Sequence, residues 1–384
     1  MPKKLLFLSH YAGRTGAPIF LLQLVTWLKT NTDLQLQVVH LNGGDLLEDF
    51  RTVTDTALCM PEKSDRYVHR LYTFLGIPHT IEDLRYRRFS RSASGAGIDL
   101  IYSNTICNGA MLARLAPLGC PVICHVHELE AMIRFFGQKN FEQNKACATH
   151  YIAASGMVKQ NLVSAHGIPE GSVDVVYPCI NTTTLPENFI DMRPALGIPE
   201  DAFVAFGSGK GISGIKGKDL FIQLAHAVAH RQPELAVHFI WVGGERDGFD
   251  EYLYRQDVER AGLAGRLHLI YDVQNPLDYF NAGNVIVSVS REEVFGLVNL
   301  EAAALGKPII CFDKGGGIAE FVEHDAGCIV PYLNIPAMAE KVIEFAQNPE
   351  LVIRLGRKAA EKIRLRHDSA VAFPGILKIV QRFL

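Results

Sequence analysis

The sequence of 384 residues lacks several features that would assign it to a well-known class of protein. No run reaches the roughly eighteen consecutive apolar residues that a membrane-spanning helix needs. The formal net charge is -3, without the excess of Lys and Arg that binding a phosphate backbone requires, which argues against a dedicated nucleic-acid binder. Chemistry on small molecules or sugars is therefore expected.

The eight cysteines form no C-x-x-C pair, and no histidine stands at zinc-finger spacing. Most of them stand in apolar runs such as "PVICHV" and "PIICF", where cysteine behaves as a small hydrophobic residue. This usage fits a reducing compartment. The start, "MPKKLLFLSH", has a short apolar run without a small-residue cleavage site, so we interpret it as a buried strand and expect a cytoplasmic protein.

A chain of this length with 48% hydrophobic residues suits two domains better than one compact core. Short strand-like runs alternate with longer segments of helical period, which predicts an α/β protein with parallel sheets covered by helices on both faces. A connector without clear period lies at 179–202. We predict a first domain at 1–181 and a second at 182–368. A terminal helix at 369–384, kinked where Pro374-Gly375 interrupts it, is expected to return to the first domain.

The predicted strands fall into two series, and ligands of such sheets bind outside the carboxyl ends of the strands. The runs are 4–10, 36–41, 99–104, 121–127, 150–155 and 174–178 in the first half, and 203–208, 237–244, 267–272, 285–290, 308–313 and 327–331 in the second.

The loop "SHYAGRTGAPIF" joins the first strand to the first helix. Its Gly13 and Gly16 let the backbone approach a ligand, and the free N–H groups of the helix start attract anions. An ordinary tight turn explains the same loop equally well.

A second glycine-rich loop, "GSGKGISGIKGKD", follows the strand at 203–208. Gly209, Gly211 and Gly214 match G-x-G-x-x-G, the fingerprint of dinucleotide binding, and an NAD-dependent oxidoreductase is therefore an alternative. The match is weak, because the loop does not open a helix directly and the acidic Glu245 follows too late in the sequence.

The same loop carries three lysines, Lys210, Lys216 and Lys218. A flexible, glycine-lined loop of this composition suits a diphosphate. A solvated basic loop is the alternative.

The stretch "CPVICHVHELE" places His125 and His127 on one face of a strand, with His127 nearest the carboxyl end. A histidine there can bind a sugar hydroxyl or phosphate, or move a proton, and a purely structural histidine is the alternative. The sequence suggests no third ligand beside this pair, so no metal site is predicted.

Two glutamates bracket an apolar run in "EVFGLVNLEAAALG". Gly296 breaks the run, so Glu293 is expected in a loop and Glu301 early in a helix. The backbone N–H groups of 295–298 would be the unsatisfied donors of that helix start, where an anion is favoured. Because a carboxylate accepts two hydroxyls, this arrangement suits a nucleotide sugar, with one glutamate at the sugar and the other at the ribose.

This stretch resembles the retaining glycosyltransferases of glycosyltransferase family 4, of the bacterial polysaccharide-biosynthesis type. Their pattern has two glutamates separated by seven residues and then small-x-G-x-P, and Val294 stands where the family usually has glycine. The resemblance extends over nearly the whole chain and is strongest at 203–330. The matching residues are Glu293, Phe295, Gly296, Leu297, Leu300, Glu301, Ala302, Gly306 and Pro308.

The resemblance implies the GT-B fold, two facing Rossmann-like domains with a cleft between them. It implies that the second domain mainly holds the donor nucleotide and the first the acceptor. By position, Glu293 would meet the donor sugar, Glu301 the ribose, Lys216 the phosphate, and His127 the sugar near the reacting bond; we take Glu293, His127 and Lys216 as catalytic.

The resemblance also implies further contacts. Asp272 and Val273 fall where the family places its base-binding loop. The remaining donor-binding residues are expected to be Gly16, Gly209, Lys210, Val294, Phe295, Gly296, Leu297 and Val298, and the acceptor-binding residues Gly13 and Asn104.

The expected activity is transfer of a hexosyl group from a nucleotide-diphosphate sugar, UDP-sugar by family frequency, to a glycan or lipid-linked acceptor with retention of anomeric configuration. The sequence has no D-x-D motif, so we expect no metal and no cofactor, with Lys216, Lys210 and the helix start stabilising the leaving diphosphate. A GT-B-type sugar-nucleotide epimerase is a further alternative.

The basic segment "DLRYRRFSRSASGAG" at 83–97 could face an anionic membrane that carries a lipid-linked acceptor. The solvated face of a helix is the alternative. In the first case the protein would be peripheral at the inner face of the membrane.

Overall fold

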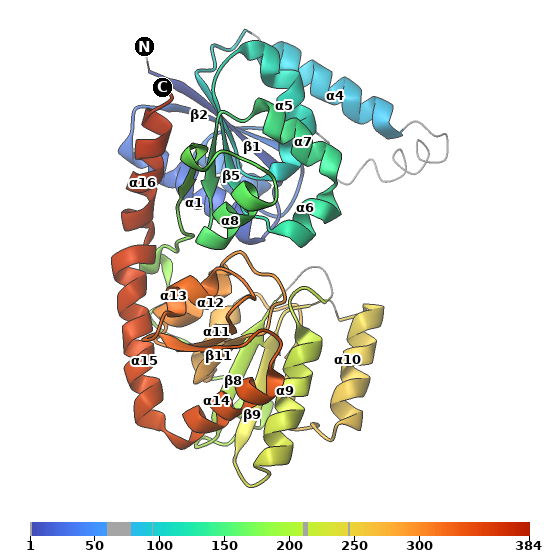
Figure 1. Cartoon of the computed structure of the whole chain (residues 1–384), viewed down its shortest axis with the longest axis vertical. Coiled ribbons are helices and arrows are strands. Elements are labelled where there is room, and N and C mark those ends of the chain that lie inside the picture. The colour runs from blue at the N-terminus through green and yellow to red at the C-terminus, as the bar shows by residue number, and fades with distance from the viewer. Residues whose placement is uncertain (1, 60–77, 94, 210–213, 245) are drawn as a thin grey trace. The chain divides into compact units, whose positions relative to one another are not determined.

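The computed structural model describes residues 2–59, 78–93, 95–209, 214–244 and 246–384, without the side chains of 78–84. The chain forms two compact units, one of residues 1–178 with 369–384 and one of residues 179–368 (Figure 1). The division falls after Pro178, at the start of the connector segment. Within the described ranges, no helix is both long and apolar enough to cross a membrane.

The first unit is built on a parallel sheet with the strand order β3-β2-β1-β4-β5-β6-β7. The order reverses beside β1, as in doubly wound sheets, which places ligand sites at the carboxyl ends of β1 and β4. The strands are β1 (Lys4–Tyr11), β2 (Gln35–Asn42), β3 (Asp55–Leu58), β4 (Leu100–Ser103), β5 (Val122–Val126), β6 (His150–Ala153) and β7 (Val173–Val175).

Helices pack on both faces of this sheet, as the alternating pattern predicts. The described α-helices are α1 (Gly16–Asn31), α2 (Leu47–Val53), α4 (Pro78–Ala93), α5 (Gly109–Leu115), α6 (Glu130–Phe136), α7 (Gln138–Cys147), α8 (Gly156–Ser164) and α16 (Ser369–Gln381).

The C-terminal helix α16 belongs to the first unit, where it packs on α1. The ring centroids of Phe20 on α1 and Phe373 on α16 lie 5.6 Å apart. The terminal helix contains Pro374 within its length and continues through this residue to Gln381; a kink at Pro374 stays a prediction.

The second unit has a parallel sheet with the order β10-β9-β8-β11-β12-β13, the same doubly wound pattern. Its strands are β8 (Phe203–Ser208), β9 (Val237–Val242), β10 (Leu267–Ile270), β11 (Val285–Ser288), β12 (Ile309–Phe312) and β13 (Gly327–Val330). Its described α-helices are α9 (Lys218–Arg231), α10 (Phe249–Arg260), α11 (Pro276–Ala282), α12 (Leu297–Ala304), α13 (Ile318–Val322), α14 (Ile335–Gln347) and α15 (Pro349–Lys362).

Apolar side chains cover both faces of the second sheet. Phe221, Trp241 and Val287 belong to the core on one face, and Phe206, Ile240 and Ile286 to the core on the other. A sheet packed on both faces confirms the predicted α/β class. It also leaves the strand ends as the places where polar side chains can gather.

Candidate functional site

Glu293 lies in the loop between β11 and α12, as predicted. A second loop holds it in place: the Glu293 N–H donates to the Gly315 carbonyl (2.8 Å), and the Gly317 N–H donates to the Glu293 carbonyl (3.2 Å). A Cβ atom on Gly316 would lie 1.7 Å from the Glu293 carbonyl oxygen. Only glycine allows this approach, and the role of the "GGG" turn was not predicted from the sequence.

Lys216 and Glu293 form an ion pair through Nζ and Oε2. Both side chains are partly accessible, with exposed fractions of 30% and 14%. The structure therefore brings together two of the three residues predicted to be catalytic, from loops that follow β8 and β11. A diphosphate at this place would offer Lys216 a second anionic partner.

Arg291 fixes these two loops to each other. Its guanidinium donates to both carboxylate oxygens of Asp219 (2.9 and 2.6 Å) and to the Gly214 carbonyl (2.6 Å). The hydrogen bonds from Arg291 hold the pKa of Asp219 below its usual value. Because Arg291 is two residues before Glu293 and Gly214 two before Lys216, the fork sets the spacing of the Lys216–Glu293 pair.

The start of α12 has no side-chain cap, which leaves backbone N–H groups available to an anion. Gly296 stands before Leu297 with a φ of 78°, in the left-handed region that favours glycine. Phe295 is buried, and the Asn299 amide donates to its carbonyl (3.1 Å). A small cavity at this helix start is lined by Ser208, Lys216, Trp241, Glu293, Val298 and Asn299, among others.

Val294, which replaces the glycine of the family pattern, fits without backbone strain, because its φ is not positive. Its carbonyl accepts from the Gly317 N–H (3.1 Å).

Glu301 lies on α12, and burial raises the pKa of its carboxyl to about 7. No ion pair to Glu301 occurs among the described residues. A buried carboxylate without a cation is costly unless something satisfies it, and such groups concentrate at functional sites.

The other donor residues predicted in the second unit lie at the carboxyl ends of strands. Gly209 follows β8, and its N–H donates to the Val242 carbonyl (3.1 Å). Asp272 follows β10 with a φ of 54°, an uncommon conformation, and Val273 packs on the core. Lys210 and Gly211 lie outside the described residues.

The interpretation of Lys218 as a phosphate-binding lysine is wrong. It is the first residue of α9, only 6% exposed, and its ammonium group pairs with Glu251. Lys218 is therefore buried and paired inside the unit, and it does not face a ligand site.

In the first unit, His127 and Asn104 meet at the carboxyl ends of β5 and β4. The His127 Nε2 lies 3.2 Å from the Asn104 Oδ1, and the Asn104 amide donates to the Ala17 carbonyl at the start of α1 (2.8 Å). Burial lowers the pKa of His127 to about 3, so its imidazole is neutral. It can exchange hydrogen bonds with a hydroxyl but carries no charge for a phosphate.

Two groups beside His127 were not predicted. Glu128 accepts from the His127 N–H (2.9 Å), and burial raises its pKa to about 7. His10, at the end of β1, has a buried Nδ1 without a partner, and burial lowers its pKa to about 4. The pKa shifts of Glu128 and His10 come from their burial in the folded unit, which the local sequence does not reveal.

The glycines of the first loop have different surroundings. A Cβ on Gly13 would lie 2.1 Å from the Tyr11 ring, so a larger residue there would displace that ring. Gly16 is the first residue of α1. Both lie at the carboxyl end of β1, as predicted.

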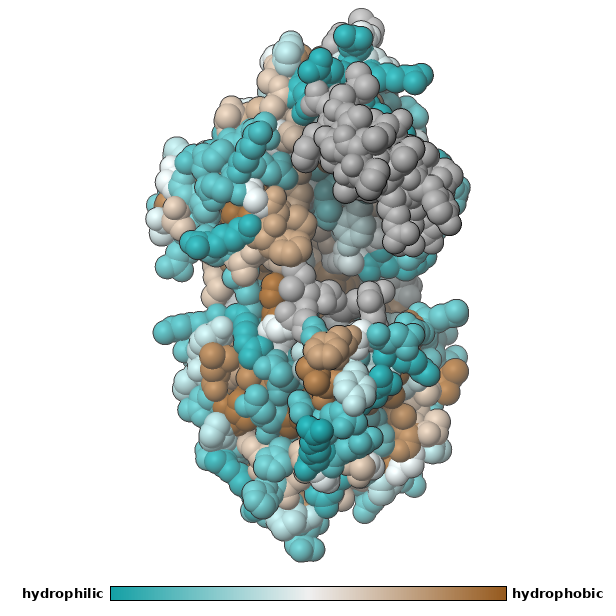
Figure 2. Space-filling model, turned by 90° about the vertical axis from the view of Figure 1, so that its right-hand side faces the viewer, coloured by the Kyte–Doolittle hydropathy of each residue, from teal (hydrophilic) through white to brown (hydrophobic). Residues whose placement is uncertain are grey.

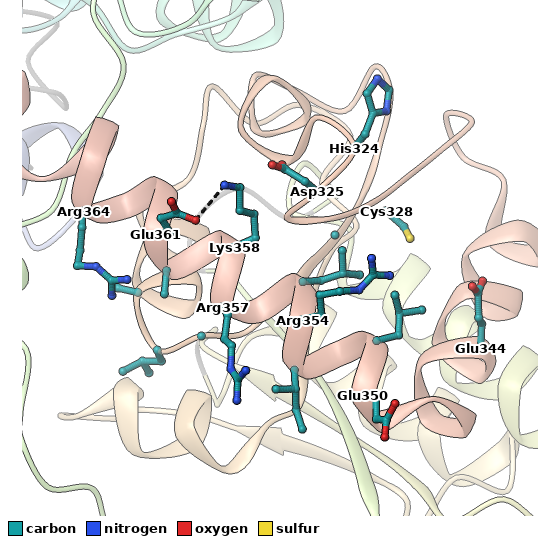
Figure 3. A pocket seen from close by; sticks show the side chains of 18 residues that line it. His324, Asp325, Cys328, Glu344, Glu350, Arg354, Arg357, Lys358, Glu361 and Arg364 are labelled. Atoms are coloured by element: carbon teal, nitrogen blue, oxygen red, sulfur yellow. Dashed lines mark hydrogen bonds and ion pairs between the residues drawn. The ribbon is translucent and has the colours of Figure 1, made fainter.

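A further groove in the described part of the second unit lies elsewhere, along α15 (Figure 3). Its lining includes Gly306, Gly327, Arg354, Arg357 and Arg364. Gly306 precedes β12 and Gly327 begins β13, so the groove lies at the amino ends of the strands. It is therefore separate from the Lys216–Glu293 pair at the carboxyl ends.

Two family models match this chain, one over most of each unit. A family model described as "Glycosyltransferase Family 4" matches residues 14–184, and one described as "Glycosyl transferases group 1" matches residues 202–348. A D-inositol 3-phosphate glycosyltransferase of Kribbella flavida is 28% identical over 227 residues, which cover 57% of this chain and 53% of the relative. One of Streptomyces bingchenggensis is 31% identical over 244 residues, 60% of this chain and 52% of the relative. The matches thus span about half the length of these relatives.

Solved structures share the fold over the full length. Anabaena HepE in complex with UDP-glucose has a TM-score of 0.79 at 20% identity, with 99% of both chains covered. The apo form of the lipopolysaccharide outer core galactosyltransferase WaaB has a TM-score of 0.75 at 14% identity, with 99% of this chain and 100% of that chain covered. The predicted GT-B fold is confirmed.

Proposed function

The chain belongs to the glycosyltransferases of family 4 and group 1, and from this premise we propose that it transfers a hexosyl group from a UDP-sugar to a glycan or lipid-linked saccharide, with retention of anomeric configuration. The observation that carries the proposal is the Lys216–Glu293 pair beside the uncapped start of α12. UDP is proposed because HepE, a protein of the same fold, binds UDP-glucose.

The second unit would hold the donor. The Lys216 ammonium and the N–H groups at the start of α12 stabilise the diphosphate as it leaves, and these charges are worth most where water is excluded. Glu293 accepts hydroxyls of the donor sugar and Glu301 those of the ribose, while the loop at Asp272 and Val273 contacts the base. No step in this scheme requires a metal.

The first unit would hold the acceptor. The neutral His127 and Asn104 orient hydroxyl groups, with Gly13 permitting close approach of the backbone. In the transfer, the bond from the anomeric carbon to the diphosphate oxygen breaks and a bond to the acceptor oxygen forms on the same face. The acceptor proton passes to the departing diphosphate.

A panel of nucleotide sugars tests the proposal, with wild type, Glu293→Ala and Lys216→Ala measured side by side and with EDTA as an added arm. We expect transfer from one UDP-sugar that persists in EDTA and is lost in both variants. Full activity of both variants would refute the site, and loss of activity in EDTA would refute metal independence.

Two alternative activities and the expected membrane contact each have their own experimental signature. An epimerase would form product without an acceptor. An NAD-dependent oxidoreductase would quench cofactor fluorescence and bind no nucleotide sugar. Membrane contact through the basic segment at 83–97 would appear as salt-sensitive sedimentation with anionic liposomes.

A further inference from the structure

Lys218 and Glu251 form a buried ion pair in the interior of the second unit, next to the candidate donor site. The side chains are 7% and 10% exposed. The Lys218 Nζ also donates to the Gly243 carbonyl (3.2 Å) and lies 5.3 to 5.7 Å from the ring centroids of Trp241, Tyr254 and Tyr271. Such a pair is costly to bury and is weak evidence for a role in stability alone.

Glu251 anchors α10 to the unit. In this helix the buried residues are Glu251 and Val258, whereas Phe249, Tyr252 and Leu253 are exposed. Figure 2 shows apolar side chains on the solvent face of the second unit, on the side where α10 lies. Val258 and Tyr254 attach the helix to the apolar core. At the start of the helix a carboxylate is buried, where an apolar side chain would be usual.

The ion pair lies directly under the turn that follows β9. A Cβ on Gly244 would lie 2.5 Å from both Lys218 Nζ and Glu251 Oε1, and a Cβ on Gly243 would lie 2.7 Å from the Gly209 carbonyl. Gly209 in turn packs on Lys216: a Cβ added at Gly209 would lie 2.8 Å from the Cβ of Lys216. A continuous series of close contacts thus leads from Glu251 to Lys216.

Trp241 gives a second connection between the two places. It contacts the Lys218 ammonium and also lines the small cavity with Lys216 and Glu293. A Cβ on Gly209 would lie 3.2 Å from its ring. Moving Lys218 would therefore move the wall of the cavity as well as the loop above it.

We propose that Lys218 and Glu251 are positioning residues, which fix the Gly243–Gly244 turn and α10 so that Gly209 and Lys216 stand at the correct place for the donor diphosphate. This inference rests on the proposed function of the Lys216–Glu293 pair. It assigns a role to a lysine that touches no ligand and to a helix that contributes no residue to the site.

Steady-state kinetics with Glu251→Gln and Lys218→Met test the proposal, with Lys358→Met as the matched control. Lys358 forms an exposed ion pair with Glu361 in the same unit (2.9 Å). In both variants of the buried pair we expect the donor KM to rise by about tenfold or more, because small displacements of positioned groups have large effects. The acceptor KM should stay within about twofold, and the control should match wild type.

A double variant, Lys218→Met with Glu251→Leu, separates positioning from stability. Apolar side chains should restore much of the lost melting temperature, as in other buried ion pairs. The donor KM should stay raised, because methionine cannot donate to the Gly243 carbonyl. Recovery of the donor KM together with the melting temperature would overturn the proposal, as would equal changes in the donor and acceptor KM.

Hydrogen exchange without any ligand keeps this test independent of the proposed function. The amides of Gly209 and of 214–217 should exchange faster in Glu251→Gln than in wild type and in Lys358→Met. Unchanged exchange at these amides would refute the positioning role even in an enzyme that transfers sugar. If wild type transferred no sugar, faster exchange would still support positioning and only the proposed function would fail.

Discussion

The two units carry parallel sheets of the same winding, yet the side chains at the carboxyl ends of their strands differ in charge. The second unit presents Lys216, Glu293 and an uncapped helix start, whereas the first presents the imidazole of His127 and the amide of Asn104. Burial makes that imidazole neutral at physiological pH. The second unit thus has a charged edge, with a cation suited to a diphosphate, whereas the first unit's edge offers the neutral imidazole of His127 and the amide of Asn104, which suit hydroxyls. The side chains at the strand ends, not the topology, distinguish the two halves.

Lys216→Ala should have the largest effect, because it removes the cation of the charged edge. We expect kcat to fall by about 10²- to 10³-fold, the usual cost of losing one group that stabilises developing charge. Rapid-quench or steady-state assays measure this directly, with Lys358→Ala as a surface control. A fall in kcat smaller than about fivefold would mean that the cation at the edge of the second unit does not stabilise the leaving diphosphate.

His127→Ala should have the next largest effect and should differ in kind. We expect kcat to fall about 10²-fold with the affinity for UDP unchanged, because a neutral imidazole orients hydroxyls but does not attract phosphate. Because the pKa of His127 is about 3, wild-type activity should show no ionisation of this residue between pH 5 and pH 9. Weaker binding of UDP in His127→Ala, relative to an exposed His226→Ala control, would contradict this assignment.

Gly316→Ala should disturb the charged edge without touching its charges. The added Cβ would lie 1.7 Å from the Glu293 carbonyl oxygen at a φ of 150°, so the loop must move. We expect a loss of about 2 kcal/mol in the free energy of unfolding and about 30-fold in kcat/KM. Gly171→Ala in the first unit is the matched control, because an added Cβ there meets no atom within 4 Å. Equal behaviour of the two variants would show that the turn does not position Glu293.

Glu301 should give the smallest effect, a pH dependence of donor binding. Its pKa is raised to about 7, so the carboxylate that accepts ribose hydroxyls is depleted as the pH falls from 8 to 6. We expect the Kd for UDP to rise by up to about tenfold over this range, since each pH unit below the pKa reduces the ionised fraction by that factor. Calorimetry on Glu301→Gln, which lacks the titrating carboxyl, measures the part of the pH dependence of the Kd that comes from ionisation of the UDP phosphate itself. An identical pH dependence in both proteins would rule out Glu301.

Most of the fold followed from local patterns, because buried parallel strands are short apolar runs and the intervening helices have a clear period. The exception among the strands is β3, whose residues Asp55–Leu58 form a short edge strand with no fully buried side chain. Such a strand carries no apolar run to detect. Pro374 did not end the helix, and α16 packs on α1 through the contact of Phe373 with Phe20.

Features of the candidate site that lie close together in the sequence could be predicted. Ion pairs between residues far apart in the sequence could not. Gly296 and the two glutamates share one loop and helix, and spacing alone relates them. The Arg291–Asp219 fork and the Lys218–Glu251 pair join residues far apart in the chain. Lysine composition could not distinguish the buried Lys218 from the accessible Lys216, because both follow the same glycine-rich loop.

Calorimetric titration of UDP, without acceptor, into wild type, Lys216→Met and His127→Ala tests the difference between the two edges most directly. We predict that Lys216→Met weakens the Kd for UDP by at least about tenfold, the cost of one charge-assisted contact, while His127→Ala stays within about twofold of wild type. Strong dependence on His127 with no dependence on Lys216 would contradict the account.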